Sequence, residues 1–176
     1  MSRANITVRK ATTRDLEAIL YIYNDAIINT TAVYNYEAHT LDMRAAWFQD
    51  KVAKNLPVLV AVDHDEVLGF STYGPFRIWA AYKYTVESSV YIHPEHKGKG
   101  IAKLLYKPLI ELAQANDVHT LVAGIDAANL ASIKLHEHFG FREVGHFKEV
   151  GFKFDRWLDL KFMQLILPTP LHPEGQ

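Results

Sequence analysis

The segment from Lys97 to Ala102 has the residue types and spacing of a loop that binds a diphosphate. Apolar residues, Val90–Ile92, precede it, and an amphipathic stretch with helical periodicity follows it. Glycines at positions 98 and 100 let the backbone approach a ligand closely and adopt dihedral angles that other residues avoid. The first turn of the following helix exposes unpaired N–H groups at the positive end of the helix dipole. We therefore expect a diphosphate cradle at this strand–helix junction.

Two common phosphate-binding motifs do not fit this spacing. A Walker loop requires Gly, four residues and then Gly-Lys with Ser or Thr, and no such run starts at Gly98. A dinucleotide fingerprint requires a third glycine three residues after the second, where Lys103 stands. Lys97–Ala102 instead resembles the acetyl-CoA pyrophosphate loop of the GNAT acetyltransferase superfamily. Lys97 replaces the Arg or Gln that opens the family pattern, and it keeps a positive charge.

A second motif, Asn129–Phe141, resembles the GNAT segment in which an Asn caps a helix that Gly-Phe follows. Asn is a favoured N-cap residue, and Gly140 can end the helix. The resemblance implies that this helix lies beside the pantetheine and adenine parts of acetyl-CoA. A metal site is not expected, because His136, Glu137 and His138 point in different directions on a helix and cannot close on one ion.

Length and composition indicate one globular domain at 1–167 with a Pro-rich tail at 168–176. The net charge of −1 provides no general attraction to nucleic acid or to an anionic membrane. No apolar run could span a bilayer and the N-terminus has no apolar signal core, so we expect a cytoplasmic protein. The chain has no cysteine, which excludes disulfides, thiolate metal sites and an acyl-cysteine intermediate.

The hydrophobic patterns predict an α/β fold with a mixed sheet and helices on both faces. The resemblance to the GNAT superfamily implies that this sheet is mostly antiparallel and has about six to seven strands. Strands are predicted at Ile6–Lys10, Pro57–Val62, Glu66–Tyr73, Tyr84–Ile92, Thr120–Gly124, Phe141–His146 and Trp157–Leu167. Helices are predicted at Asp15–Asn24, Asp42–Lys54, Gly98–Ala115 and Asn129–Phe139. This order of elements is similar to that of the GNAT fold across essentially the whole chain.

A third segment, Tyr82–Ile92, resembles the Thr-Val-Glu, two-residue, Val-Tyr-Val/Ile run of phosphinothricin acetyltransferase-like enzymes, as does Lys153–Asp159. The resemblance implies transfer of acetyl from acetyl-CoA to the α-amine of a small amino acid or analogue, by direct attack in a ternary complex. Phosphinothricin, methionine sulfone and methionine sulfoximine are the implied substrate type. The resemblance also implies a homodimer through the exposed aromatic and C-terminal strands.

Two residues are candidates for acid–base chemistry. An α-ammonium group must lose a proton before it can attack a thioester, and Glu87 is the candidate base, acting directly or through one water. His136 stands where many GNAT enzymes carry a Tyr that protonates the leaving thiolate. It either donates that proton or makes a structural hydrogen bond.

The resemblance also assigns the binding residues. The cofactor is expected to contact Val90, Tyr91, Ile92, Lys97, Gly98, Lys99, Gly100, Ile101, Ala102, Asn129 and Ser132. A backbone N–H of Val90–Ile92 can stabilise the charge that develops on the thioester oxygen. The substrate is expected to contact Tyr34, Arg77, Trp79, Tyr82 and Lys83. Core or dimer packing is the alternative for the three aromatic residues, and a solvated surface position is the alternative for the two cations.

Two other functions stay open from the sequence. The acceptor could be another amine, such as aminoadipate, tryptophan, a peptide N-terminus or a polyamine, although a polyamine site should be acidic and Arg77 and Lys83 oppose it. The chain could instead be a non-catalytic acyl-CoA sensor, which would not need Glu87 and His136. No basic stripe supports nucleic-acid binding.

Overall fold

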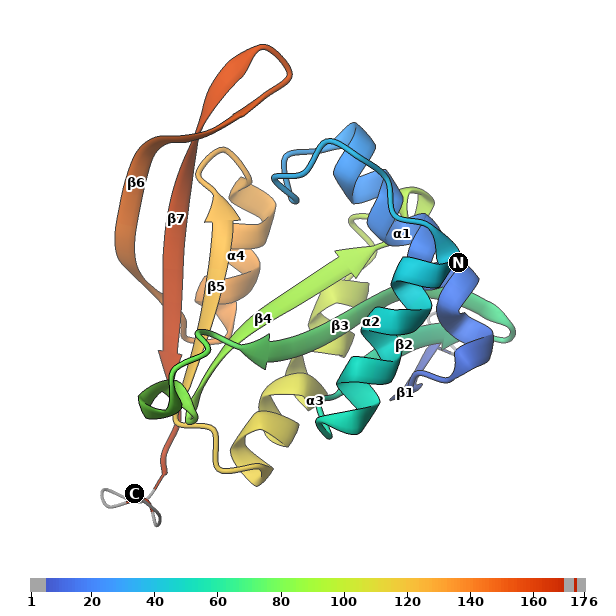
Figure 1. The fold of residues 1–176 in the computed structure, drawn as a ribbon, viewed down its shortest axis with the longest axis horizontal. Helices are drawn as coiled ribbons and strands as arrows, with labels where there is room; N and C mark the ends of the chain where they lie inside the picture. Colours follow the sequence, from blue (N-terminus) through green and yellow to red (C-terminus); the bar gives the residue numbers. More distant parts are fainter. Residues whose placement is uncertain (1–5, 170–172, 174–176) are drawn as a thin grey trace.

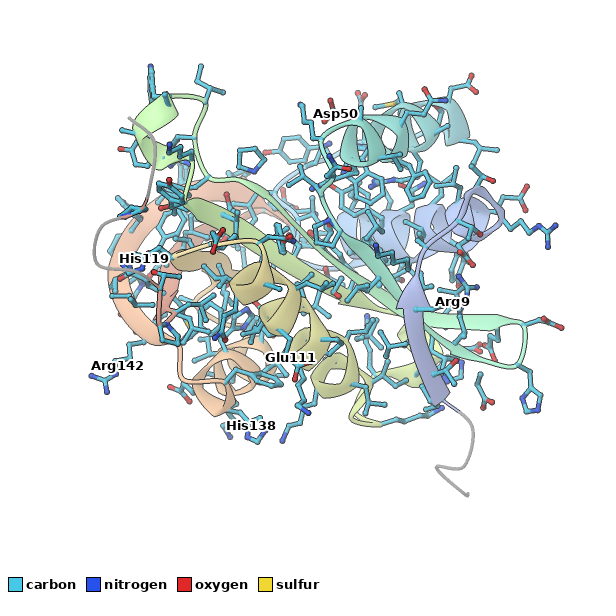
Figure 2. The ribbon with its side chains drawn as sticks, turned by 90° about the horizontal axis from the view of Figure 1, so that it is seen from below. Arg9, Asp50, Glu111, His119, His138 and Arg142 are labelled. Carbon is cyan, nitrogen blue, oxygen red and sulfur yellow. The ribbon has the colours of Figure 1, made fainter. Side chains whose placement is uncertain are left out.

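The computed structural model describes residues 6–169 and residue 173, and it contains one seven-stranded sheet with helices on both faces (Figure 1, Figure 2). The predicted tail at 168–176 falls mostly outside these described residues. The strands are β1 (Ile6–Lys10), β2 (Val58–Asp63), β3 (Glu66–Pro75), β4 (Thr85–Ile92), β5 (Thr120–Asp126), β6 (Arg142–Lys153) and β7 (Arg156–Ile166). The helices are α1 (Leu16–Asn29), α2 (Leu41–Ala53), α3 (Ile101–Ala115) and α4 (Leu130–His138).

The strand order in the sheet is β1-β2-β3-β4-β5-β7-β6. All neighbouring strands are antiparallel except β4 and β5, which are parallel and are joined through α3. This arrangement confirms the predicted mixed, mostly antiparallel sheet. A parallel pair needs a long crossover connection, and the predicted helix after the glycine loop provides it.

Each face of the sheet has its own apolar core. Ile19, Ile22 and Phe48 of α1 and α2 pack on one face, against Val60 and Phe70. The residues packed on the opposite face are centred on α3 and include Leu105, Tyr106, Leu109, Leu121 and Phe141. Figure 2 shows the two helical layers, with Asp50 of α2 on one side of the sheet and Glu111 of α3 and His138 of α4 on the other. The strand β2, between β1 and β3, alternates between the two cores and is buried on both faces.

The strands β4 and β5 pair only at their beginnings. Their register covers Thr85 with Thr120, Val86 with Leu121 and Glu87 with Val122, and no pair follows. Beyond Glu87 the two strands diverge, as Figure 1 shows. The backbone of β4 from Ser88 to Ile92 therefore has no strand neighbour on the β5 side, and a gap opens in the middle of the sheet.

Some predicted boundaries were wrong for local physical reasons. The first helix continues past Asn24 to Asn29, because Ala26 and Ile27 extend its buried face. The third helix begins at Ile101 and not at Gly98, since Gly98 and Gly100 have φ of +78° and +82°, outside the helical region. The strand predicted at Phe141–His146 continues to Lys153. The extension to Lys153 was missed because most residues of this strand are exposed on both faces, so the sequence lacks the alternation of apolar and polar residues that indicates a strand with one buried face.

Candidate active site

A cleft of about 950 Å³ occupies the gap between β4 and β5. Five parts of the chain wall it: the end of α1 with the residues after it, the outer half of β4, the glycine loop with the start of α3, the end of β5 with α4, and the turn between β6 and β7. Each wall belongs to a different element, and the parallel crossover brings them to one place. The cleft is thus a consequence of the sheet topology.

Gly98 and Gly100 give one end of the cleft its shape. Both have a positive φ, and a Cβ added at Gly98 would meet no atom within 4 Å. Backbone conformation, and not crowding, therefore requires glycine at position 98. Gly100 is the N-cap of α3, so the unpaired N–H groups of the first turn lie at this end. The Lys97 ammonium lies 3.3 Å from the Asp25 carboxylate and ties the loop to α1.

The structure brings together almost all residues predicted to hold the cofactor. Those that line the cleft are Val90, Tyr91, Ile92, Lys97, Gly98, Gly100, Ile101, Ala102, Asn129 and Ser132. Asn129 caps α4 as predicted, because its side chain accepts a hydrogen bond from the Ser132 N–H at 3.1 Å. Lys99 is not among the lining residues; its Nζ lies 3.1 Å from Nδ1 of His96.

A smaller cavity of about 240 Å³ adjoins the cleft on the α1 side of the sheet. Ala32, Ser88, Ser89, Tyr91, Gly124 and Asp126 line both spaces. Val33, Tyr34, Glu87 and Leu160 line only the smaller cavity. Two molecules bound in the two spaces would therefore meet beside the outer half of β4, next to Glu87.

Glu87 lies where β4 and β5 separate. A Cβ added at Gly124 of β5 would lie 3.4 Å from Oε1 of Glu87, so the carboxylate lies over a residue without a side chain. Burial raises the pKa of Glu87, and the positive charge of Arg77 partly opposes this rise. A carboxylate with a raised pKa is a better proton acceptor than an ordinary one.

His136 is the centre of a buried chain of hydrogen bonds. It is 3% exposed, and its Nδ1–H donates to the Ser132 carbonyl at 2.7 Å. Its Nε2 lies 2.8 Å from the Tyr106 hydroxyl, which in turn lies 2.6 Å from Oγ of Ser88. Because a carbonyl can only accept, the neutral ring carries its proton on Nδ1 and Nε2 accepts from Tyr106. Burial lowers the pKa of His136.

The predicted substrate residues fall into two groups. Tyr34 lines the smaller cavity, and its hydroxyl donates to the Asp159 carbonyl at 3.1 Å. Desolvation and the nearby charges of Asp126 and Asp159 raise the pKa of Tyr34 to about 12, so its hydroxyl stays a donor. The other predicted residues lie on the segment 76–83, outside the cavity lining.

The segment 76–83 carries charges and exposed aromatic rings. The Arg77 guanidinium stacks 4.0 Å above the Phe76 ring and is close enough to lower the pKa of Glu87. Trp79 is 64% exposed, and its ring lies 6.3 Å from that of Tyr82. Lys83 lies 4.8 Å from the centre of the Tyr84 ring. Of the two predicted substrate cations, Arg77 is therefore the one whose charge acts on the candidate base.

The sequence pointed to Tyr34 after α1, but not to Gly124 and Asp126 of β5 or to residues 30–33. Asp126 is buried; its Oδ1 accepts from the Ala128 N–H at 2.8 Å, and its Oδ2 has no hydrogen-bond partner among the described residues. A glycine inside a buried strand often marks a close approach of another group, and that signal could have identified Gly124. The residues after α1 carry no comparable local signal.

Residues 6–169 and 173 contain no group of three or more His, Asp or Glu side chains that could hold a metal ion. No helix within the same residues is long and apolar enough to cross a membrane.

Comparison with known proteins identifies the family. The sequence pattern of the acetyltransferase (GNAT) domain matches residues 8–162, which is most of the chain. The chain is a GNAT acetyltransferase. This acetyltransferase is 46% identical over 169 residues to the L-methionine sulfoximine/L-methionine sulfone acetyltransferase of Pseudomonas aeruginosa, and the match covers 95% of this chain and 98% of the relative.

Two further similarities concern a more distant enzyme and a solved structure. The phosphinothricin N-acetyltransferase of Streptomyces coelicolor is 35% identical to this acetyltransferase, with 92% of this chain and 96% of the relative covered. An acetyltransferase from Salmonella typhimurium, solved with its cofactor acetyl-CoA, superposes with a TM-score of 0.94 at 41% identity. That match covers 97% of this chain and 99% of the solved chain. The predicted GNAT fold is thereby confirmed.

Proposed function

We propose that this acetyltransferase transfers the acetyl group of acetyl-CoA to the α-amine of a small amino acid of the methionine sulfone, methionine sulfoximine or phosphinothricin type. One observation carries the proposal: a large cleft and a small cavity meet beside Glu87, a half-buried carboxylate with a raised pKa. The relatives named above act on substrates of this type. The small cavity has a volume suited to an amino acid and not to a folded protein surface.

The cleft fits acetyl-CoA in shape and in donors. The positive-φ glycines and the first turn of α3 offer N–H groups to the diphosphate, with Gly98 and Gly100 leaving room for it. The unpaired edge of β4 from Ser88 to Ile92 can pair with the amides of pantetheine. Acetyl-CoA supplies the acetyl group as a thioester, and the thiolate of CoA leaves.

Glu87 is the proposed base of the reaction. It takes a proton from the substrate ammonium, directly or through one water, so that the neutral nitrogen can attack. Backbone N–H groups in Val90–Ile92 stabilise the negative charge that develops on the acetyl oxygen. Both reactants are held at once, so the transfer is direct and needs no enzyme-bound acetyl group.

His136 is proposed to position the site, not to donate a proton. Both ring nitrogens are engaged, with Nδ1–H on the Ser132 carbonyl and Nε2 facing the Tyr106 hydroxyl. Proton donation from Nδ1–H would leave a buried carbonyl unpaired. We expect nitrogen NMR to report His136 as the neutral ring with the proton on Nδ1 at pH values below 6.5, the ordinary histidine pKa. A doubly protonated ring near pH 6.5 would return the acid role to His136.

Arg77 is the proposed contact for the substrate carboxylate, and it also tunes Glu87. Because its charge lowers the pKa of Glu87, Arg77→Met should raise that pKa and shift the acid limb of the kcat/KM profile to higher pH. The KM for the amino acid should rise as well. Arg142→Met is the control, since Figure 2 shows that side chain extending away from the protein. An acid limb at the wild-type pH would show that the charge of Arg77 does not act on Glu87.

Assembly and location are part of the proposal. Exposed apolar residues on the 76–83 segment and on β6 and β7 support a homodimer: Ile78, Trp79, Val144, Phe147, Val150, Phe152 and Trp157. Light scattering that gives the mass of one chain at micromolar concentration would contradict it. A cytoplasmic location stays a prediction.

The substrate proposal is tested by release of the CoA thiol from acetyl-CoA. The panel contains methionine sulfone, methionine sulfoximine, phosphinothricin, ordinary amino acids, spermidine and a short peptide. The absence of cysteine keeps protein thiols out of the signal. We expect the highest kcat/KM with the sulfone, the sulfoximine or phosphinothricin. A preference for spermidine or the peptide would contradict the proposal.

A further inference from the structure

Lys153 is a buried cation whose hydrogen-bond partners are backbone carbonyls. It is 5% exposed, and its Nζ donates to the carbonyls of Thr30 and Val33 at 2.8 Å each, and also to that of Ile27. An ammonium has three N–H groups, so the three carbonyls satisfy it. Burying a charge is costly without such bonds, which suggests that the lysine stabilises a specific backbone conformation at this place.

The three carbonyls mark the end of α1 and the residues that follow it. Ile27 lies in the last turn of α1, Thr30 is its C-cap, and Val33 lies in the connection to α2. The last carbonyls of a helix have no partner within the helix, and the helix dipole favours a cation there. Lys153 therefore satisfies the end of α1 and binds the backbone of the connection at the same time.

The connection held in this way is a wall of the site. We call residues 30–34 the acceptor segment. Thr30, Thr31 and Ala32 line the large cleft, and Ala32, Val33 and Tyr34 line the small cavity. A displacement of the segment would change the shape of both spaces where they meet.

The acceptor segment also contacts the hairpin of β6 and β7 through Tyr34. The Tyr34 hydroxyl donates to the Asp159 carbonyl, and its ring lies so close to Gly151 that an added Cβ would be 2.7 Å from the ring. Tyr36, just after the segment, donates to the Phe152 carbonyl. Lys153 is thus the charged member of a set of contacts that dock the segment on one hairpin.

The hairpin itself is fixed beside the site. Its two-residue turn, Phe154 and Asp155, has φ of +51° and +56°, a conformation that residues with side chains adopt rarely. Phe154 and Arg156 line the large cleft. Figure 1 shows the tip of the hairpin reaching toward the connection between α1 and α2. The turn therefore places Lys153 at a defined distance from the acceptor segment.

We propose that Lys153 is a positioning residue for acetyl transfer: its ammonium holds the acceptor segment in the conformation that shapes the amino-acid cavity. This inference rests on the proposed function. It also gives a role to the Lys153–Asp159 segment, which the sequence singled out without one. The hairpin, far along the chain from Glu87, would then help to set the affinity for the amine.

Lys153→Met tests the proposal, because it keeps an unbranched side chain out to Cε and removes the ammonium with its three hydrogen bonds. We expect the KM for methionine sulfone to rise about tenfold or more, while the Kd for acetyl-CoA stays within about threefold. A purely structural role would lower the folded fraction and hence kcat, but would leave the KM unchanged. Hydrogen exchange at the amides of residues 30–34 should accelerate in parallel.

Lys51→Met is the matched control. Lys51 is 8% exposed, and its Nζ donates to the Tyr73 carbonyl at 2.7 Å, away from the acceptor segment. It should lower the melting temperature like Lys153→Met and leave both the KM for the amine and the exchange of residues 30–34 at their wild-type values. If Lys153→Met does not fold, Gly151→Ala tests the same docking by displacing the Tyr34 ring, and the same rise in KM is expected.

Unchanged KM and unchanged exchange of residues 30–34 in a folded variant would overturn the role of Lys153. The exchange measurement does not need activity. If the wild type acetylates none of the panel of amines, the proposed function fails, while faster exchange in Lys153→Met would still establish that Lys153 holds the segment. The two failures are therefore distinguishable.

Discussion

Replacing Glu87 with Gln should lower kcat by about 10²- to 10⁴-fold, the usual contribution of a general base. The amide has nearly the same size as the carboxylate but cannot take the proton of the substrate ammonium. The Kd for acetyl-CoA should stay at the wild-type value, because Glu87 lines only the small cavity. Steady-state kinetics with methionine sulfone and calorimetry with acetyl-CoA measure the two quantities.

Glu87→Gln should also change the stability of the protein, and it should raise stability although it lowers kcat. Burial raises the pKa of Glu87 in the folded chain, so above that pKa the ionised carboxylate opposes folding. Below the ordinary value of 4.5 the carboxyl group is protonated in both the folded and the unfolded chain, and the penalty disappears. Glu87→Gln should therefore raise the melting temperature near neutral pH and lose this advantage in acid. Glu111→Gln, at an exposed position paired with Lys107, should change neither property. Wild-type kcat in Glu87→Gln would exclude Glu87 as the base.

Replacing both loop glycines with Ala should raise the Kd for acetyl-CoA about 30- to 1000-fold, because a left-handed backbone costs about 1–2 kcal/mol for each residue with a side chain and hence about 2–4 kcal/mol for the two. Gly98 and Gly100 have φ of +78° and +82°, so Gly98→Ala with Gly100→Ala would let the loop relax away from its cradle shape. At saturating acetyl-CoA, kcat should stay within about threefold of the wild-type value, since the loop does not touch Glu87.

Gly145→Ala is the control for the loop variant. Its added Cβ would have its nearest neighbour at 3.8 Å, an ordinary contact, and Gly145 lies on β6 away from the loop. It should bind acetyl-CoA like the wild type. Wild-type affinity in the double loop variant would mean that the backbone of the loop does not hold the diphosphate.

The parts of the site that are local in the chain could be predicted from the sequence. The glycine loop and the helix capped by Asn129 each carry their signal within a few residues, because turn and cap preferences are local. Lys97 and Asn129 were found in this way, and both line the cleft. The same holds for Glu87, whose neighbours in a recognisable strand gave its position.

The rest depends on contacts between distant segments, which no local pattern encodes. Gly124 and Asp126 belong to the site because β5 is parallel to β4 and the two strands then diverge. The acceptor segment is held by Lys153, more than a hundred residues away in the chain. Lys99, in contrast, has the expected residue type in the expected loop, but its side chain turns to His96.

The proposed reaction joins the acetyl group of acetyl-CoA directly to the nitrogen of an amino acid. The most direct measurement is mass spectrometry of the product formed from isotope-labelled acetyl-CoA and methionine sulfone, with wild type and Glu87→Gln side by side. We expect N-acetyl methionine sulfone carrying the label with the wild type, and very little of it with the variant. Release of CoA without an acetylated amino acid, or equal product from both proteins, would contradict it.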